Sequence, residues 1–263
     1  MSEQTSQLQA ADIFSVDGRV AIVTGASSGF GARFARVLHA GGATVVVTAR
    51  RGDRLDALAD DLGPRIIPVT GDVTNNDDLA RVVAAASEVA DGRIDVLVNN
   101  AGIGNPMPAE DEPVEHWRKV MDVNLNSAFF ITQLVARGML ARRSGSVINI
   151  ASMLGLVASS PIKQASYSAS KGAMVNLTRE LGCQWGRSGV RVNAIAPGWF
   201  NTEMTAEKMF ADERSMQFVT RNCPMARGGA EQELDGALLF LASDASTYVT
   251  GHTLVVDGGW SAR

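Results

Sequence analysis

The chain has 263 residues, of which 46% are hydrophobic and 20% charged, so it can bury a sizeable core and is neither disordered nor collagen-like. Its 24 basic and 28 acidic residues leave a net charge of -4, which argues against broad binding to nucleic-acid backbones. No apolar run approaches the roughly 18 to 20 residues of a membrane span. We therefore expect neither nucleic acid nor a membrane as a partner.

The cysteine content and the N-terminal segment predict a cytoplasmic protein. Cys183 and Cys223 are too few for a disulfide framework, which fits a reducing compartment. Residues 1–15 carry acidic but no basic side chains and lack the apolar centre of a secretory signal. We expect them to form a mobile tail ahead of a single catalytic domain over residues 16–263.

Short β-branched runs alternate with longer amphipathic segments along the chain, which is typical of a parallel sheet covered by helices on both faces. The predicted strands span residues 19–24, 44–48, 65–69, 96–99, 146–150, 191–194 and 253–256. The predicted helices span residues 29–40, 54–62, 77–90, 114–140, 165–185 and 231–242. Because strand–helix–strand crossovers are almost always right-handed, this order predicts a single-domain, doubly wound α/β fold of seven strands.

Helix starts and one long connection add detail to this pattern. Asp53 and Asn75 stand where they would cap the second and third predicted helices. Residues 198–229 contain no clear strand or simple helix, and they exceed the ordinary length of a connection. This segment is predicted to be a lid over the substrate.

A glycine-rich segment, Thr-Gly-Ala-Ser-Ser-Gly-Phe-Gly, follows the first predicted strand and opens the first predicted helix. Gly25 allows a sharp turn, Gly29 lets a pyrophosphate approach the backbone, and Gly31 lets the helix pack closely on the strand. Free N–H groups at the start of the helix would hold the phosphates. An incidental Gly/Ser turn is the alternative. The predicted nucleotide-binding residues are Gly25, Ser27, Ser28, Gly29, Phe30 and Gly31.

Two later motifs stand with this segment: Asn-Asn-Ala-Gly at residues 99–102, and Tyr-Ser-Ala-Ser-Lys at residues 167–171. As a set, and in this order, the three motifs resemble those of the short-chain dehydrogenase/reductase family. The resemblance covers residues 17–260. It implies a Rossmann-like sheet of strand order 3-2-1-4-5-6-7, a nicotinamide cofactor and often a homotetramer.

The end of the second predicted strand bears on the choice between NAD and NADP. An NAD site is expected to place an Asp or Glu there, which accepts from the 2'-hydroxyl of the adenosine ribose. Here Ala49 takes that place and is followed by Arg50 and Arg51, whose guanidinium groups suit a 2'-phosphate. The sequence therefore favours NADP(H), with an exposed arginine pair at a helix start as the alternative.

Further cofactor contacts follow from the resemblance. Asp72 and Val73 match a pair that contacts the adenine, although Asp72 also suits a turn after the strand. Thr202 matches a residue that hydrogen-bonds the nicotinamide carboxamide, although it also suits a helix N-cap. Matches beside the adenosine ribose or the nicotinamide are Asn99, which is also expected to steady the sheet, Ala101, Gly102, Pro197 and Gly198.

Tyr167 and Lys171 lie four positions apart on a predicted helix, so their side chains emerge on one face about one turn apart. A phenol with an ordinary pKa of about 10 is a poor acid or base at neutral pH, but a nearby ammonium lowers that pKa. Tyr167 would then give a proton to a carbonyl oxygen or take one from an alcohol, and both residues would border the cofactor. The alternative is a packed tyrosine beside a solvated lysine.

Two more residues complete the predicted catalytic set. Ser152, at the end of the fifth predicted strand, would polarise the reacting oxygen, with Ser159 or Ser160 as alternatives. By resemblance, Asn124 links the lysine to solvent through water, and Asn126 is the competing choice.

Apolar and Met-rich side chains near these motifs predict a pocket for a substrate with little charge, although plain core packing produces the same pattern. The candidates are Ile103, Met153, Leu154, Ile162, Trp199, Met204, Met209, Phe210, Met216 and Phe218.

The expected function is hydride transfer between NADP(H) and a ketone or secondary alcohol, with Tyr167 as general acid and base. Reduction of a 3-oxoacyl thioester is the substrate theme that the resemblance suggests. A sugar or polyol dehydrogenase is the alternative among enzymes, because the fold alone does not specify the substrate. A nucleotide-binding sensor without turnover is the alternative outside them.

Two expectations concern partners and metals. The helices predicted over residues 114–140 and 165–185 are more apolar than one buried face requires, which predicts a homodimer or homotetramer. The three histidines share no ligand spacing with one another or with the cysteines, so no catalytic metal is expected.

Overall fold

The structure, a computed structural model, describes residues 10–203, 205, 210 and 212–263. The first nine residues of the predicted tail and the pocket candidates Met204 and Met209 lie outside the described residues. The rest of the predicted tail includes a short helix, α1 Ala10–Ile13. Within the described ranges, no helix combines the length and apolar character needed to cross a bilayer.

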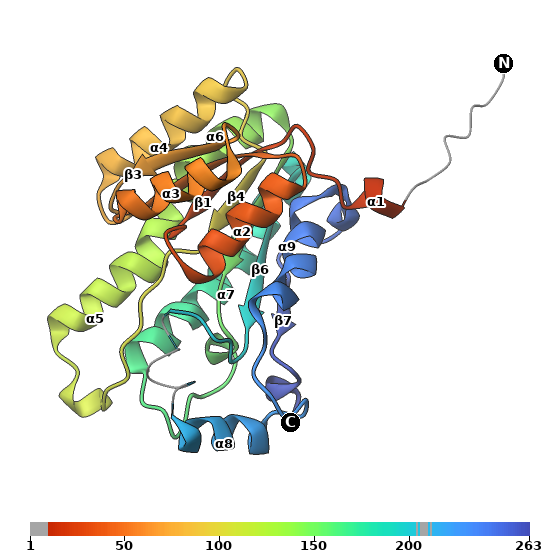
Figure 1. Ribbon diagram of the computed structural model, residues 1–263. Helices are drawn as coiled ribbons and strands as arrows, with labels where there is room; N and C mark the ends of the chain where they lie inside the picture. Colours follow the sequence, from red (N-terminus) through yellow and green to blue (C-terminus); the bar gives the residue numbers. More distant parts are fainter. Residues whose placement is uncertain (1–9, 204, 206–209, 211) are drawn as a thin grey trace.

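Seven parallel strands form one sheet in the order β3-β2-β1-β4-β5-β6-β7, which confirms the order that the resemblance implied (Figure 1). All five residues of β1 are buried, because helices cover both faces of the sheet. The sixth strand continues to Pro197, three residues beyond its predicted end. The strands are β1 Val20–Thr24, β2 Thr44–Ala49, β3 Ile66–Thr70, β4 Val96–Asn99, β5 Gly145–Ile150, β6 Val190–Pro197 and β7 Thr253–Val256.

Helices form a layer on each face of the sheet (Figure 1). On one face Phe34, Leu55 and Leu238 pack into a core with the strands, and on the other face Leu79 and Ile131 do so. The first layer contains α2 Gly29–Ala40, α3 Gly52–Leu62 and α9 Asp235–Ala242. The second layer contains α4 Asn76–Val89, α6 Ser127–Arg142 and α7 Ala165–Trp185.

The single helix predicted over residues 114–140 is interrupted. It consists of α5 Val114–Met121, a π-helical turn at Asp122–Asn126, and then α6. A π-helical turn adds one residue to a helical repeat without ending the helix, and residues 121–127 contain no Gly or Pro that would mark a break. The interruption was therefore not visible in the sequence.

The two predicted N-caps have different outcomes. Asn75 caps α4, since its Oδ1 accepts hydrogen bonds from the N–H groups of Asp77 at 2.8 Å and Asp78 at 3.4 Å. The prediction for Asp53 is wrong, because α3 begins at Gly52 with Arg51 as the residue before it. Asp53 lies instead in the first turn, where its negative charge interacts favourably with the positive end of the helix dipole.

The segment 198–229, predicted to hold no simple helix, contains α8 Glu213–Asn222. Asp212 caps it by accepting from the N–H of Ser215 at 2.8 Å. Val219 is its one fully buried residue among those described, and such a narrow apolar face leaves little periodic signal in the sequence. The C-terminal Arg263 donates to Asn222 at the end of this helix, at 3.0 Å.

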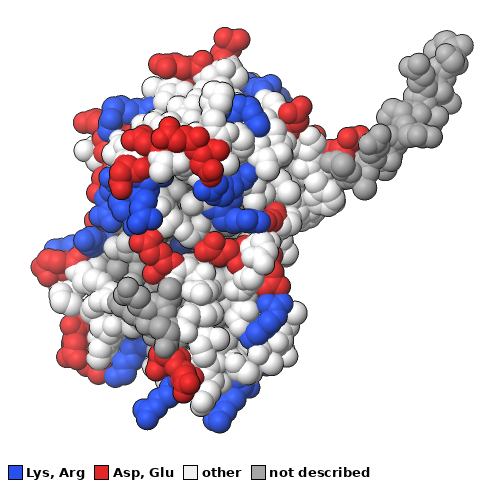
Figure 2. Space-filling view, in the orientation of Figure 1, with Lys and Arg blue, Asp and Glu red and all other residues white. Residues whose placement is uncertain are grey.

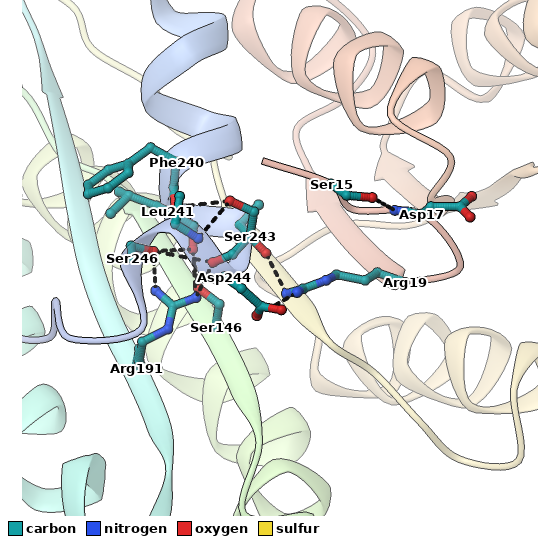
Figure 3. A network of polar contacts seen from close by, with 12 residues as sticks. Ser15, Asp17, Arg19, Ser146, Arg191, Phe240, Leu241, Ser243, Asp244 and Ser246 are labelled. Atoms are coloured by element: carbon teal, nitrogen blue, oxygen red, sulfur yellow. Dashed lines mark hydrogen bonds and ion pairs between the residues drawn. The ribbon is translucent and has the colours of Figure 1, made fainter. Parts of the chain in front are cut away.

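A network around Arg191 joins the sheet to the end of α9 (Figure 3). From β6, Arg191 donates to the hydroxyl of Ser246 at 2.6 Å and to the carbonyl of Leu241 at 3.0 Å. Arg19, just before β1, pairs with Asp244 at 2.7 Å. Burial, assisted by the nearby Arg19, lowers the pKa of Arg191 to about 10, and Asp244 acts in the opposite direction. The network fixes the start of β1 and β6 against the end of α9 and the residues that follow it.

Replacing Gly31 by Ala should destabilise the fold. A Cβ at this position would overlap the Gly25 carbonyl and lie 2.6 Å from Nδ2 of Asn100. We expect a loss of about 1–3 kcal/mol in the free energy of unfolding, measured by urea denaturation. Gly236→Ala in α9 is the control, because its Cβ would meet nothing within 4 Å. Equal stability of both variants would contradict this packing argument.

Candidate active site

A cavity of about 730 Å³ opens at the carboxyl ends of β1, β2, β4, β5 and β6. Ligands of doubly wound folds bind at this edge of the sheet. All predicted cofactor residues line it except Gly31 and Asn99, and so does Ser152. Figure 2 shows that basic and acidic side chains are interspersed over the visible face of the molecule. The charges that act on a ligand are therefore those of side chains next to the cavity.

The glycine-rich loop is held in place by the motif that follows β4. Nδ2 of Asn100 donates to the carbonyls of Thr24 at 2.9 Å and Gly25 at 3.2 Å, and the N–H of Ala101 donates to Oγ1 of Thr24 at 3.0 Å. Gly25 has a φ of +70°, a conformation that side chains disfavour. These bonds join the ends of β1 and β4 into one wall of the cavity.

The N-terminus of α2 fits an anionic group. Ser28, its N-cap residue, lines the cavity, and its side chain accepts no hydrogen bond from the first turn of the helix. Among the described residues of that turn there is no acidic side chain. N–H groups without a capping acceptor, at the positive end of a helix dipole, suit a phosphate. The residues present therefore match the pyrophosphate of a dinucleotide.

Two arginines at the end of β2 differ in their contacts with the described residues. Ala49 is buried and lines the cavity. Within the described chain, Arg50 is exposed and makes no hydrogen bond or ion pair. Arg51 turns toward the glycine-rich loop and donates to Oγ of Ser28 at 2.8 Å and to Oε1 of Glu203 at 2.6 Å. The sequence analysis identified Arg51 but not its partner Glu203.

Asp72 lines the cavity and also makes the turn that the sequence offered as its alternative. Its Oδ1 accepts from the N–H of Thr74 at 2.9 Å and from the Thr74 hydroxyl at 2.8 Å. These bonds, helped by the charge of Arg50, lower the pKa of Asp72 despite its partial burial. The carboxylate is therefore held in one orientation at the predicted adenine end.

The side chain of Asn99 points into the protein core, which corrects the expectation of a side chain bordering the ribose. It is 3% exposed, and its Nδ2 donates to Oγ1 of Thr132 and Oδ1 of Asn149, both at 2.8 Å. Asn149 in turn donates to Thr178 at 2.9 Å. This buried chain of polar contacts joins β4, β5, α6 and α7, as the expected steadying of the sheet requires.

Tyr167, Lys171 and Ser152 meet at the end of β5. Lys171 is 4% exposed, its Nζ lies 5.7 Å from the centroid of the Tyr167 ring, and it donates to the carbonyl of Ile150 at 2.7 Å. Ser152 is 7% exposed, and its Oγ accepts from the N–H of Leu154 at 3.1 Å. All three side chains line the same cavity.

The electrostatics of this cluster differ from the expectation. Tyr167 keeps some exposed surface at the cavity wall but is densely surrounded, and burial raises its pKa, with the Ser152 hydroxyl acting in the opposite direction. Burial also lowers the pKa of Lys171, to about 8. The ammonium of Lys171 donates a hydrogen bond to the Ile150 carbonyl and lies over the ring of Tyr167. The protein's own groups therefore do not produce the expected lowering of the Tyr167 pKa.

Asn124 occupies the π-helical turn and is fully buried. Its Oδ1 accepts from the N–H of Ile103 at 2.8 Å, and its Nδ2 donates to the Ile103 carbonyl at 2.9 Å and to Oγ of Ser170 at 3.0 Å. A Cβ on Gly102 would lie 3.5 Å from Nζ of Lys171 and 3.6 Å from Oδ1 of Asn124, which places the two side chains around one point. Asn126 instead bonds to Asp122 on the outside of the helix.

Comparison with known proteins agrees with this geometry. A family model described as enoyl-(acyl carrier protein) reductase matches residues 25–261. Gluconate 5-dehydrogenase of Gluconobacter oxydans (strain 621H) is 41% identical over 251 residues, which is 94% of this chain and 96% of that protein. The chain belongs to the short-chain dehydrogenase/reductase family. The prediction of an oxidoreductase of this family is thereby confirmed.

Two further members of the family are similar along nearly their whole length. Galactitol 2-dehydrogenase (L-tagatose-forming) of Cereibacter sphaeroides is 40% identical, covering 95% of this chain and 97% of that protein. The crystal structure of a gluconate 5-dehydrogenase from Burkholderia cenocepacia J2315 in complex with NADP and tartrate is 36% identical, with a TM-score of 0.90. It covers 97% of this chain and all of that one.

Most of the described side chains that were predicted to line an apolar pocket belong to a hydrophobic core cluster instead. Of the eight candidates that the structure describes, Ile103 lines the cavity. Met153, Leu154 and Trp199 are buried in one cluster with Trp260, and further candidates pack against it. The remaining described candidates are Ile162, Phe210 and Phe218, at the edge of that cluster, and Met216.

Sequence analysis missed a contact at the start of α7, the helix that carries Tyr167. Glu112, from the loop before α5, accepts from the N–H of Ser166 at 3.3 Å and bonds to Nδ1 of His116 at 2.7 Å. Gln164, the residue before α7, makes no side-chain cap of its own. Glu112 therefore acts as a cap from 54 residues away, a distance over which no local pattern reports contact.

Ser152→Ala should lower kcat about 100-fold or more, because it removes a donor aimed into the cavity beside Tyr167. The dissociation constant for the nucleotide, measured by fluorescence titration, should change little. Ser159→Ala is the matched control, since the Ser159 hydroxyl already donates to the Ile162 carbonyl at 2.7 Å. Near-full activity of Ser152→Ala would remove this hydroxyl from the mechanism.

The low pKa of Lys171 predicts a pH-dependent stability. The ordinary lysine pKa is 10.5 and the folded value is about 8, so between these values the unfolded chain binds the proton and the folded chain does not. Stability from this group therefore rises with pH across that window, by on the order of 3 kcal/mol. Urea denaturation between pH 7 and 10 should show this rise against Lys171→Met. Parallel profiles for the two proteins would refute it.

Proposed function

We propose that the protein interconverts a secondary alcohol and a ketone on a polyhydroxylated substrate, a sugar acid or polyol, with NADP(H) as cofactor. The observation that carries the proposal is the convergence of Ser152, Tyr167 and Lys171 on the cavity that also contains the glycine-rich loop. One cavity thus holds a dinucleotide-type phosphate cradle and a set of proton-transfer groups.

The choice of substrate class is supported from two sides. Relatives across nearly the whole chain are named as dehydrogenases of gluconate and galactitol. Six of the eight described apolar candidates for the substrate pocket pack into or against one cluster. Both observations favour a sugar or polyol over the 3-oxoacyl thioester.

Each catalytic side chain has a role that follows from its surroundings. We assign to Tyr167 the proton at the substrate oxygen, and to Ser152 a hydrogen bond to that same oxygen. Lys171, fixed on the Ile150 carbonyl, places its ammonium over the ring of Tyr167, where its protonated form supplies positive charge. Asn124 anchors the loop at Ile103 beside them. The nicotinamide, when bound, supplies or accepts the hydride.

Assignment of the cofactor residues follows the cavity wall. Ser27, Ser28 and Gly29 at the start of α2 would hold the pyrophosphate, and Asp72 with Val73 the adenine. Toward the catalytic set, the wall consists of Phe30, Ala101, Gly102, Pro197, Gly198 and Thr202. Gly31 contributes by its close packing against Gly25 rather than by contact with a ligand.

NADP(H) is the proposed cofactor because of the charge at the end of β2. No acidic residue stands at position 49, Arg51 points toward the loop, and Arg50 is exposed, with no hydrogen bond or ion pair to the described residues. A similar solved structure is described as a complex with NADP. Guanidinium groups suit the doubly charged 2'-phosphate, which NAD lacks.

Two wider features of the prediction belong to this proposal. Thr202, Glu203 and Thr205 line the cavity, which supports a lid within residues 198–229. Exposed apolar side chains on α5 and α6, Trp117 at 41% and Phe130 at 41%, support association of copies into a dimer or tetramer.

Steady-state assays test the proposal directly. We expect turnover with NADPH or NADP⁺ on keto sugar acids and polyols, at a higher kcat/KM than with NADH or NAD⁺ and than on 3-oxoacyl thioesters. Tyr167→Phe should lose at least about 100-fold in kcat while still binding nucleotide. Tight nucleotide binding with no turnover on any compound would instead favour the sensor, and unchanged turnover of Tyr167→Phe would refute the assigned chemistry.

A further inference from the structure

Arg51 lies between the glycine-rich loop and the segment that follows β6, and it bonds to both. On the loop side, its Nη2 donates to Oγ of Ser27 at 3.0 Å and to Oγ of Ser28 at 2.8 Å. On the other side, Nη1 donates to Oε1 of Glu203 at 2.6 Å and Nη2 to Oε2 at 3.0 Å. The carboxylate thus binds the guanidinium through both oxygens, which is the strongest geometry for such a pair.

Glu203 belongs to the segment after β6, 152 residues from Arg51 in sequence. Both residues line the cavity, together with both loop serines and Ala49. A carboxylate and a phosphate bind the arginine fork in the same way, through two oxygens. The groups that would receive a 2'-phosphate are therefore already bound to an anion of the protein itself.

We propose that Glu203 competes with the 2'-phosphate of NADP(H) for Arg51 and thereby sets how strongly the protein distinguishes NADP(H) from NAD(H). The inference rests on the proposed cofactor preference. Binding of a 2'-phosphate would separate Glu203 from Arg51, because two anions on one guanidinium repel each other. Binding of NAD(H) would leave the pair intact. Glu203 is thus a specificity-determining residue that weakens the preference of the site for NADP(H).

The carboxylate remains an anion at every pH at which the enzyme would work. Its hydrogen bonds with Arg51 and then Ser28 lower the pKa of Glu203 to about 2. Protonation therefore does not relieve the competition near neutral pH. The side chains of Arg51 and Glu203 are 41% and 53% exposed, so the pair is of moderate strength and can be exchanged for a stronger anion.

Exchange of Glu203 for the 2'-phosphate on Arg51 would also change the contacts of the cavity wall. Glu203 follows Thr202, whose N–H donates to Oγ1 of Thr205 at 3.0 Å. The Glu203–Arg51 ion pair joins this segment to the end of β2, and Arg51 in turn donates to Ser27 and Ser28 of the glycine-rich loop. A 2'-phosphate would release that link, whereas a nucleotide without the phosphate would keep it.

Two small probes isolate the 2'-phosphate from the rest of the cofactor. Adenosine 2',5'-bisphosphate carries it and AMP does not, and isothermal titration calorimetry gives a dissociation constant for each. In Glu203→Gln we expect adenosine 2',5'-bisphosphate to bind about two- to fivefold more tightly, as suits an exposed ion pair, and AMP to bind unchanged. NADP⁺ and NAD⁺ should repeat this difference.

Asp53→Asn is the matched control, since Asp53 also acts on Arg51 through its charge but accepts no hydrogen bond from it. It should leave the ratio of the two dissociation constants near that of the wild type. In an Arg51→Gln background, Glu203→Gln should lose its effect. Circular dichroism checks that each variant is folded.

The outcomes separate the inference from the proposed function. If Arg51→Gln weakens adenosine 2',5'-bisphosphate but Glu203→Gln leaves it unchanged or weaker, Glu203 is no competitor and the inference is wrong. The same conclusion follows if Glu203→Gln acts equally with and without Arg51. If the wild type binds both probes alike and Arg51→Gln changes neither, the proposed NADP(H) preference fails, and the inference fails with it.

Discussion

The hydrogen bond from Lys171 to the carbonyl of Ile150 is the contact on which the arrangement of the site depends. It fastens the second turn of α7 to the end of β5, two residues before Ser152. Because Tyr167 is one turn earlier on the same helix, this bond determines where the phenol lies relative to the serine hydroxyl. The cost is a buried ammonium, which burial shifts to a pKa of about 8.

Other contacts hold the same helix from the outside. Glu112 caps its start, and Asn124 links it through Ser170 to the loop at Ile103. The buried chain from Asn99 through Asn149 to Thr178 joins its middle to the centre of the sheet. Buried polar groups of this kind are costly when unpaired, so the hydrogen bonds that Asn149 and Thr178 make favour one arrangement of α7.

The charges of the site act over short range. The chain carries a net charge of -4, so no general attraction for a phosphate-bearing ligand exists. The groups suited to bind an anion are the N–H groups at the start of α2 and the arginines after β2. One of these arginines, Arg51, already pairs with Glu203. Because the carboxylate of Glu203 already binds Arg51, the selectivity for NADP(H) over NAD(H) depends on how the 2'-phosphate and this carboxylate compete. It is not a property of the arginine alone.

Much of the fold and site was readable from the sequence because both arise from local patterns. Buried runs of β-branched residues predicted the seven strands, the glycine spacing predicted the loop, and the four-residue spacing of Tyr167 and Lys171 placed them on one helical face. The π-helical turn contains no Gly or Pro to mark it, and the mostly polar surface of α8 leaves only a narrow buried face, so neither was predicted.

By itself, then, the sequence determined the order of elements, the family and the kinds of chemical group at the site, since these depend on residue type and spacing. Only the tertiary structure decided that Asn99 faces the core, that most of the described apolar candidates form a cluster instead of a pocket, and that Arg51 is already paired with Glu203. Such contacts join residues tens to hundreds of positions apart, and side-chain direction at that range is set by how the layers pack, which no local pattern contains.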